Sequence, residues 1–259
     1  MIPPRCGCRC FAAELEGLPD GASVAVLSMM GSLNPITKGH ITMFDEARKL
    51  LLNEGLGDFH RPEYLEFFAS CIGLIKLNAD EHVDQKMRLR GQQNLGYETR
   101  AHLVRLATVG KSWLALDETR DGFKVLELSW PRLNFTYICM NGADDVWNNR
   151  KYNYNFANAW ATKMLIMGRP GYTQPVYEAL KKRRVDFEGG VCILGPELPN
   201  ISSSAARSGA IEQLDPTVAA YLESTHPQLL AQHWQSTQPS GGDSADPGPG
   251  HPDSATRIS

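Results

Sequence analysis

The sequence predicts an α/β protein with a doubly wound parallel sheet, and two observations support this. Apolar runs of strand length, which suit parallel strands covered on both faces, recur along the chain. Segments whose apolar residues recur at helical spacing alternate with these runs, as the crossover connections of a parallel sheet require. The expected strands are residues 23–29, 72–77, 113–117, 135–140, 163–167 and 191–194. Because ligands of such sheets bind at the carboxyl ends of the strands, a functional site is expected there.

The clearest unit consists of the first strand, the turn after it and the helix that follows. Pro35 keeps the residue before it out of a helix. The helix is expected over residues 38–53, where Ile41, Phe44 and Ala47 recur at helical spacing. Further helices are expected over residues 62–68 and 99–108, after the serine triplet 202–204, and from residue 216 onward. Residues 80–96 are polar and are predicted to form a mobile loop over a site.

The domain organisation expected from the sequence is simple. Residues 1–20 are interpreted as a poorly ordered leader and residues 21–232 as a single domain. Residues 233–259 are rich in Ser, Gly, Pro, Asp and Gln, which predicts a disordered tail.

The overall composition argues against several classes of protein. Hydrophobic residues make up 42% and charged residues 21% of the chain, as in soluble globular proteins. The net charge of −3 argues against a general nucleic-acid binder or membrane binder. No apolar run approaches the ~18 residues that span a bilayer, and no signal peptide precedes the domain. We therefore expect an intracellular protein, cytoplasmic or nuclear; whether it forms a homo-oligomer stays open.

Three of the six cysteines, Cys6, Cys8 and Cys10, form a tight cluster near the N-terminus. Their spacing is not a usual zinc pattern, and no second group of ligands follows nearby. We expect reduced thiols there, and no metal ion held by protein ligands.

Two segments far apart in the chain carry the functional signal. Residues 31–40 are Gly-Ser-Leu-Asn-Pro-Ile-Thr-Lys-Gly-His, and residues 201–207 are Ile-Ser-Ser-Ser-Ala-Ala-Arg. Each has the form of a loop that enters a helix, where free N–H groups and the helix dipole favour an anion. His40 could donate to a phosphate oxygen, and Arg207 lies one turn inside its helix, so its guanidinium can fold back toward an anion. Together the two segments predict an enzyme that handles a nucleoside triphosphate.

Other polar and aromatic residues have two interpretations each. Asp144 follows an expected strand, and it could accept hydrogen bonds from a ribose or an amide or could cap the next helix. Trp113, Trp147 and Trp160 could stack on a planar ring, although buried core tryptophans are commoner. No general acid–base pair is identified, but displacement at phosphorus needs mainly positioning and charge neutralisation.

The segments 31–40 and 201–207 together resemble the nicotinamide mononucleotide adenylyltransferase family, within the [HT]-x-G-H nucleotidyltransferase superfamily. The family's opening motif is G-[ST]-F-[ND]-P followed by [HT]-x-x-H, and its closing motif is I-S-S-T-x-x-R. Arg100, the pair Trp113 and Asp117, and Gly142-Ala143-Asp144 are further matches. The resemblance implies a Rossmann-like nucleotidyltransferase fold. It also implies adenylyl transfer from ATP to nicotinamide or nicotinate mononucleotide, giving NAD or deamido-NAD and pyrophosphate.

Carried over residue by residue, the resemblance implies that His40 and Arg207 are catalytic and that Mg²⁺ is bound mainly through the ATP phosphates. It implies that ATP is bound by Gly31, Ser32, His40, Ser203, Ser204 and Arg207. It implies that the pyridine nucleotide is bound by Gly31, Ser32, Asn34, Trp113, Gly142, Asp144 and Trp160, with Trp113 stacked on the pyridine.

The departures from the family pattern leave several alternatives open. Leu33 stands where the family has Phe, Ser204 where it has Thr, and Thr37 at the first histidine position. Lys86, Arg88 and Arg90 are the candidates for holding the mononucleotide phosphate. The second ring-stacking tryptophan is Trp160 or Trp147, and the preference for the amide or the acid mononucleotide is open. Another small-molecule nucleotidyltransferase, of the pantetheine-phosphate or cytidylyl type, and a non-catalytic nucleotide-binding module remain as alternative functions.

Overall fold

A computed structural model of the chain describes residues 9–55, 65–119, 121–153, 163–182 and 191–231. Its centre is a six-stranded sheet in the order β3-β2-β1-β4-β5-β6, with every neighbouring pair parallel. The strands are β1 (Ser23–Gly31), β2 (Ser70–Leu77), β3 (Leu114–Leu116), β4 (Asn134–Gly142), β5 (Lys163–Gly168) and β6 (Cys192–Glu197). The predicted doubly wound α/β fold is confirmed.

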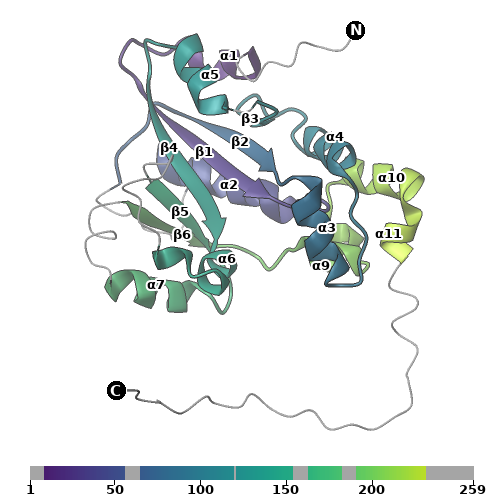
Figure 1. Ribbon diagram of the computed structural model, residues 1–259. Coiled ribbons are helices and arrows are strands. Elements are labelled where there is room, and N and C mark those ends of the chain that lie inside the picture. The colour runs from purple at the N-terminus through teal and green to yellow at the C-terminus, as the bar shows by residue number, and fades with distance from the viewer. Residues whose placement is uncertain (1–8, 56–64, 120, 154–162, 183–190, 232–259) are drawn as a thin grey trace, which may run out of the picture.

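The sheet reverses its direction of winding between β1 and β4. From β1 the chain proceeds outward through β2 to β3, then returns to β4 on the other side of β1 and proceeds to β6. The crossovers on the two sides of this point cover opposite faces, so a crevice opens beyond the carboxyl ends of β1 and β4. In Figure 1 the arrowheads of β1, β2 and β4 point toward α3, α6 and α9, which surround this crevice.

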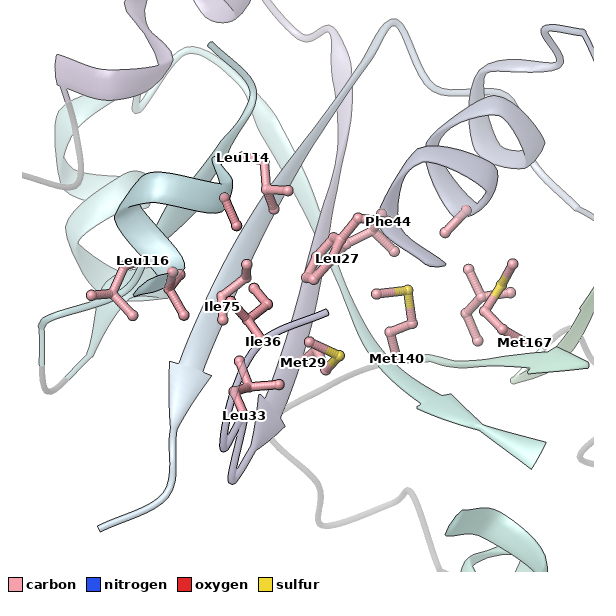
Figure 2. Packing of buried hydrophobic residues seen from close by; sticks show 14 of the residues in the cluster. Leu27, Met29, Leu33, Ile36, Phe44, Ile75, Leu114, Leu116, Met140 and Met167 are labelled. Carbon is pink, nitrogen blue, oxygen red and sulfur yellow. The ribbon is translucent and has the colours of Figure 1, made fainter. Parts of the chain in front are cut away.

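One face of the sheet carries the largest apolar core. The helices that cover it are α2 (Lys38–Leu52), α4 (Tyr97–Ala107), α9 (Ser203–Arg207), α10 (Pro216–Thr225) and α11 (Pro227–Ala231). Phe44 of α2 packs on Leu27 of β1, and Leu33 and Ile36, from the loop after β1, lie beside Met29 and Ile75 (Figure 2). The loop that enters α2 is therefore anchored in the core by two buried side chains.

The opposite face is covered by two groups of helices. The 3₁₀ turn η1 (Arg9–Phe11), α1 (Ala12–Leu15) and α5 (Gly122–Ser129) cover β1 and β2, and α6 (Ala143–Asn148) and α7 (Thr173–Lys182) cover β5 and β6. Two further 3₁₀ turns are η2 (Lys151–Asn153) and η4 (Ile211–Gln213). Phe11 and Leu15 are fully buried, so the packed domain begins before the expected boundary at residue 21. The remaining leader residues, 1–8, and the tail, 233–259, lie outside the described residues.

The polar stretch predicted as a mobile loop is mostly helical, and that prediction is wrong. Helix α3 (Asp80–Arg88) occupies its first half because Val83 and Met87, one turn apart, are buried, and Asp80 and Glu81 lie in its first turn. The helix expected over residues 62–68 is absent from its described part, 65–68, where the chain is irregular. None of the helices in the described part of the chain combines the length and apolar character that a membrane span needs.

Candidate functional site

The two segments that carry the sequence signal meet in the structure. Ser203 Oγ donates a hydrogen bond to the carbonyl of Pro35 (2.7 Å), and Arg207 Nη1 donates to the carbonyl of Asn34. A Cβ atom on Gly39 would lie 2.8 Å from the Cβ of Ile201, so only glycine allows this approach. The loop after β1 and the start of α9 therefore form one continuous structure beside the crevice.

His40 occupies the first turn of α2, where it completes a capping box. Its Nδ1 accepts a hydrogen bond from the backbone N–H of Thr37 (3.1 Å), and the Thr37 hydroxyl lies 2.8 Å from the same nitrogen. Because Nδ1 is an acceptor here, the neutral ring carries its hydrogen on Nε2. His40 thus has one N–H left to donate to a ligand.

The charge state of His40 follows from its surroundings. Burial and then the positive charge of Arg169 lower the pKa of His40 to about 4, although the backbone hydrogen bond with Thr37 acts to raise it. At neutral pH the imidazole is therefore uncharged, and it can act only as a hydrogen-bond donor through Nε2.

A small cavity of about 60 Å³ lies next to His40. It opens at the carboxyl ends of β4 and β5, where backbone polar groups and apolar side chains both line it. Its lining residues are Gly39, His40, Met43, Gly142, Met167, Gly168, Arg169, Leu198, Pro199 and Ile201. This combination of apolar walls and backbone polar groups suits part of a flat heteroaromatic ring.

Asp144 and Arg169 join two strand ends at this cavity. Arg169 Nη1 donates to Asp144 Oδ2 (3.1 Å), and Arg169 Nη2 donates to Asn200 Oδ1 and the Ile201 carbonyl, both at 3.0 Å. Asp144 is therefore an ion-pair partner, and α6 has no side-chain cap. A Cβ on Gly142 would lie 2.7 Å from Asp144 Oδ1, so the glycine leaves room for the carboxylate.

Arg207 is buried among neutral partners. Its Nε donates to Gln92 Oε1 (3.0 Å) and its Nη2 to Ser204 Oγ (3.1 Å), in addition to the bond with the Asn34 carbonyl. Burial and the nearby charge of Arg90 lower the pKa of Arg207 to about 10, so it is still a cation at neutral pH. Within the described residues, no carboxylate forms an ion pair with it.

Arg100 supports the Gly31–Ser32 turn. This residue matches the family pattern in the sequence, but no role was predicted for it. This fully buried side chain of α4 donates to the carbonyls of Ser32 and Asn78, each at 2.9 Å, and to Asp80 Oδ1 at 2.8 Å. The hydrogen bonds of Arg100 and Tyr97 with Asp80 help to lower the pKa of that carboxyl against the opposing effect of burial. The turn is therefore held by the buried guanidinium of Arg100, whose ion-pair partner Asp80 is 41% exposed.

Asn34 supports the same loop, and it does not face the crevice. Its side-chain amide donates to the Gln93 carbonyl (3.1 Å) and accepts from the Leu95 N–H (3.0 Å), and the side chain is buried. The Asn34 side chain therefore positions the loop, and its expected contact with the pyridine nucleotide stays a prediction.

The structure separates the three candidates for the mononucleotide phosphate. Lys86 lies within electrostatic reach of Arg90, Arg207 and Asp145, and burial followed by the two arginines lowers its pKa. Arg90 Nη1 donates to Ser204 Oγ (3.2 Å). Arg88 instead lines an outer hollow of α3. Lys86 and Arg90 thus face the crevice, and Arg88 faces away from it.

Comparison with known proteins finds similarity at the level of structure. No family model and no curated protein matches the chain. A solved structure of Plasmodium falciparum nicotinic acid mononucleotide adenylyltransferase complexed with NaAD is similar over 77% of this chain and 95% of its own, at 14% identity and a TM-score of 0.47. A second structure of that enzyme, complexed with APC, is similar over 81% of this chain and 93% of its own, at 15% identity and a TM-score of 0.41.

The structure describes two of the three candidate tryptophans, Trp113 and Trp147, and neither lines the cavity next to His40. Trp113 precedes β3 at its amino end, and its ring lies 4.8 Å from the guanidinium carbon of Arg48, near the far end of α2 from His40. The first residue of β3, Leu114, pairs with Gly73 in the middle of β2, so Trp113 lies short of the carboxyl ends of the strands, and its stacking on a pyridine stays a prediction. Trp147 of α6 is 39% exposed beside Tyr152, and Trp160 lies outside the described residues.

No cluster of metal ligands appears in the described ranges, where no group of three His, Cys, Asp or Glu side chains is suitably placed. Cys6 and Cys8 lie outside those ranges, and Cys10 is exposed in η1.

Proposed function

We propose that the protein is a nucleotidyltransferase that transfers the adenylyl group of ATP to nicotinate or nicotinamide mononucleotide, releasing pyrophosphate in a step of NAD biosynthesis. One observation carries the proposal: His40, Ser203, Ser204 and Arg207 come together from distant segments beside the switch-point crevice. The resemblance of the two motifs to this adenylyltransferase family supports the choice of substrates.

The triphosphate binds on the Arg207 side of the crevice. Arg207 and Ser204 offer a guanidinium and a hydroxyl to the β- and γ-phosphates, and Ser203 keeps the start of α9 against the loop after β1. Charge-assisted hydrogen bonds of this kind are about twice as strong as those between neutral groups. Because Arg207 lacks an acidic partner among the described residues, a phosphate anion supplies the missing negative charge.

The base of ATP occupies the cavity next to His40, between Met43, Met167 and Leu198. Gly142 lines this cavity, and Asp144 pairs with the lining residue Arg169, so both are expected to contact the nucleotide. We expect the α-phosphate to lie close to Nε2 of His40, between the base and the triphosphate tail.

In the reaction, a phosphate oxygen of the mononucleotide attacks the α-phosphorus in line. A new P–O bond forms, the bond from the α-phosphorus to the oxygen bridging to the β-phosphate breaks, and its electron pair leaves with pyrophosphate. His40 donates through Nε2 to an oxygen of the α-phosphate and stabilises the charge that develops there. The protein positions the groups and neutralises charge, and no side chain needs to form a covalent bond.

Magnesium fits this site only as a partner of ATP. The crevice is bordered by Arg207, Arg90 and Lys86, and the described residues offer no carboxylate cluster that could hold the ion. Mg²⁺ would therefore arrive on the phosphate oxygens, where it supplies further neutralisation of the pyrophosphate charge. We assign the mononucleotide phosphate to Lys86, which lies within electrostatic reach of Arg207 and Asp145.

The test is dinucleotide formation from ATP and Mg²⁺, with nicotinate and nicotinamide mononucleotides assayed side by side. Product from either one supports the proposal, and the ratio of the two kcat/KM values gives the amide or acid preference. Folded protein that makes no product from either would contradict it.

The position of Trp113 favours retaining a second candidate function. Neither Trp113 nor Trp147 lines the cavity next to His40, and Trp113 instead packs beside Arg48. The second candidate is nucleotidyl transfer to another phosphorylated acceptor, such as 4′-phosphopantetheine with ATP or phosphocholine with CTP. A panel of these acceptors distinguishes it from the pyridine reaction.

A further inference from the structure

Two guanidinium groups converge on one hydroxyl at the edge of the crevice. Arg90 Nη1 lies 3.2 Å from Ser204 Oγ, and Arg207 Nη2 lies 3.1 Å from the same oxygen. Arg90 lies two residues beyond the last residue of α3, and Arg207 ends α9, so the two cations come from segments far apart in the chain. The hydrogen bond between Arg90 and Ser204 connects the segment after α3 with α9.

This arrangement gathers positive charge without compensation. In the described part of the chain, neither Arg90 nor Arg207 forms an ion pair, and their hydrogen-bond partners are the neutral Ser204, Gln92 and Asn34 carbonyl. Each of these cations acts on Lys86, whose pKa they lower together with burial, and Arg90 also lowers the pKa of Arg207. Like charges held this close repel one another, and a bound polyanion would relieve the repulsion.

We infer that Arg90 is a second phosphate-binding guanidinium, which with Arg207 and Ser204 clamps the linear polyphosphate end of the nucleotide. In terms of the proposed function, on which this inference rests for its reaction, Arg90 binds the β- and γ-phosphates that leave as pyrophosphate. Arg90 therefore does not bind the mononucleotide phosphate, which we assign to Lys86. Two planar guanidinium groups that share one hydroxyl present several N–H donors, and such groups suit the oxygens of a phosphate.

The contribution of Arg90 to the reaction would be electrostatic. As the bond from the α-phosphorus to the bridging oxygen breaks, its electron pair moves to pyrophosphate, and negative charge grows on the β-phosphate side. A guanidinium already in contact with Ser204 needs little reorganisation to receive that charge.

Arg88 provides a matched control two residues away. Arg88 is the last residue of α3, and Arg90 lies two residues beyond it. Both carry the same charge, and both are exposed. Arg88 lines an outer hollow with Glu81, Asp84, Gln85 and Leu89. Replacing either arginine removes one positive charge from the same part of the chain, but of the two it is Arg90 that contacts Ser204.

The experiment compares Arg90→Ala, Arg90→Lys and Arg88→Ala with the wild-type chain, using inorganic tripolyphosphate as the probe in calorimetric titrations without Mg²⁺. We expect the Kd for tripolyphosphate to rise about tenfold or more in Arg90→Ala, to rise by less in Arg90→Lys, and to change less than about twofold in Arg88→Ala. In steady-state assays, Arg90→Ala should raise the KM for ATP and the KM for pyrophosphate in the reverse reaction. The KM for the mononucleotide should stay within about twofold. Circular dichroism checks that each variant is folded.

Other outcomes would overturn the inference. Equal weakening in Arg90→Ala and Arg88→Ala would mean that only net charge matters, and an unchanged Kd in Arg90→Ala would remove the clamp. A rise in the KM for the mononucleotide alone would assign Arg90 to the other phosphate. Tripolyphosphate binding that depends on Arg90, in a protein that makes no pyridine dinucleotide, would keep the clamp and refute the proposed acceptor.

Discussion

Arg169 and Asp144 form an ion pair of 3.1 Å that connects the carboxyl ends of β5 and β4 at the cavity beside His40. The same guanidinium bonds the carbonyl of Ile201, which contacts Gly39 at the start of α2. The Arg169 side chain thus connects the end of β5, the start of α6 and the segment before α9. Its positive charge also acts on the nearby imidazole of His40.

Replacing Arg169 with methionine should raise the pKa of His40. The folded-state pKa of about 4 lies below the usual value, partly because Arg169 disfavours a second positive charge. Removing that charge moves the pKa of His40 upward, toward its ordinary value, which NMR titration of the ligand-free protein measures. Arg105→Met, at an exposed arginine paired with Glu118, should leave the titration unchanged. A His40 pKa that does not rise in Arg169→Met would show that burial alone depresses it.

The depressed pKa of His40 also has a consequence for stability. Because the folded state holds His40 neutral and the unfolded chain protonates it near pH 6.5, stability should fall as pH decreases from about 6.5 toward 4. Urea unfolding at several pH values, with wild type and His40→Gln compared, measures this loss. The variant should show a smaller decrease over that window, and identical decreases would contradict the assignment to His40.

His40→Ala should lower kcat by at least about a hundredfold while the fold survives, as when an oriented transition-state donor is lost. The Nδ1 side of the ring is already used by Thr37, so the alanine variant also loses a cap of α2. Kinetics with saturating ATP and mononucleotide test this, with His82→Ala, an exposed histidine of α3, as the control. Near-normal kcat in His40→Ala would remove the mechanism.

Trp113→Ala should destabilise the protein by about 1–3 kcal/mol, because the half-buried ring packs on the main core and under Arg48. Because its ring packs beside Arg48 and does not line the cavity next to His40, the KM values for ATP and the mononucleotide should change little and equally. Denaturant unfolding and steady-state kinetics measure the two effects. A selective rise in the KM for the mononucleotide would return Trp113 to the substrate site.

Arg100→Met should cost about 2–4 kcal/mol of stability, because it leaves the carbonyls of Ser32 and Asn78 without their donor and removes one of the hydrogen bonds that Asp80 accepts. The Gly31–Ser32 turn should loosen, and the KM for ATP should rise as a consequence. Arg105→Met on the same helix should cost less than about 1 kcal/mol, since that arginine forms an exposed pair. Equal losses in the two variants would mean that Arg100 does not hold the turn.

Much of the fold was predictable because its signals are local. Six apolar runs of strand length and the helix after the first of them correspond to observed elements within a few residues. The errors occur where tertiary contacts decide. Helix α3 looks polar in sequence, and only burial of Val83 and Met87 against the rest of the protein makes it a helix. Phe11 and Leu15 belong to a short segment whose order depends on the sheet face they cover.

The sequence by itself determined the doubly wound sheet and the two motifs at its switch point, since apolar periodicity and the spacing of Gly, Ser, His and Arg are local properties of the chain. Only the tertiary structure decided which cations meet. It placed Arg90 and Lys86 toward Arg207 and Arg88 away from it, inserted Arg100 against the Gly31 turn, and placed the ring of Trp113 beside Arg48 of α2. The direction of a side chain on a helix or at a strand end depends on packing between distant segments, and no local pattern specifies that packing.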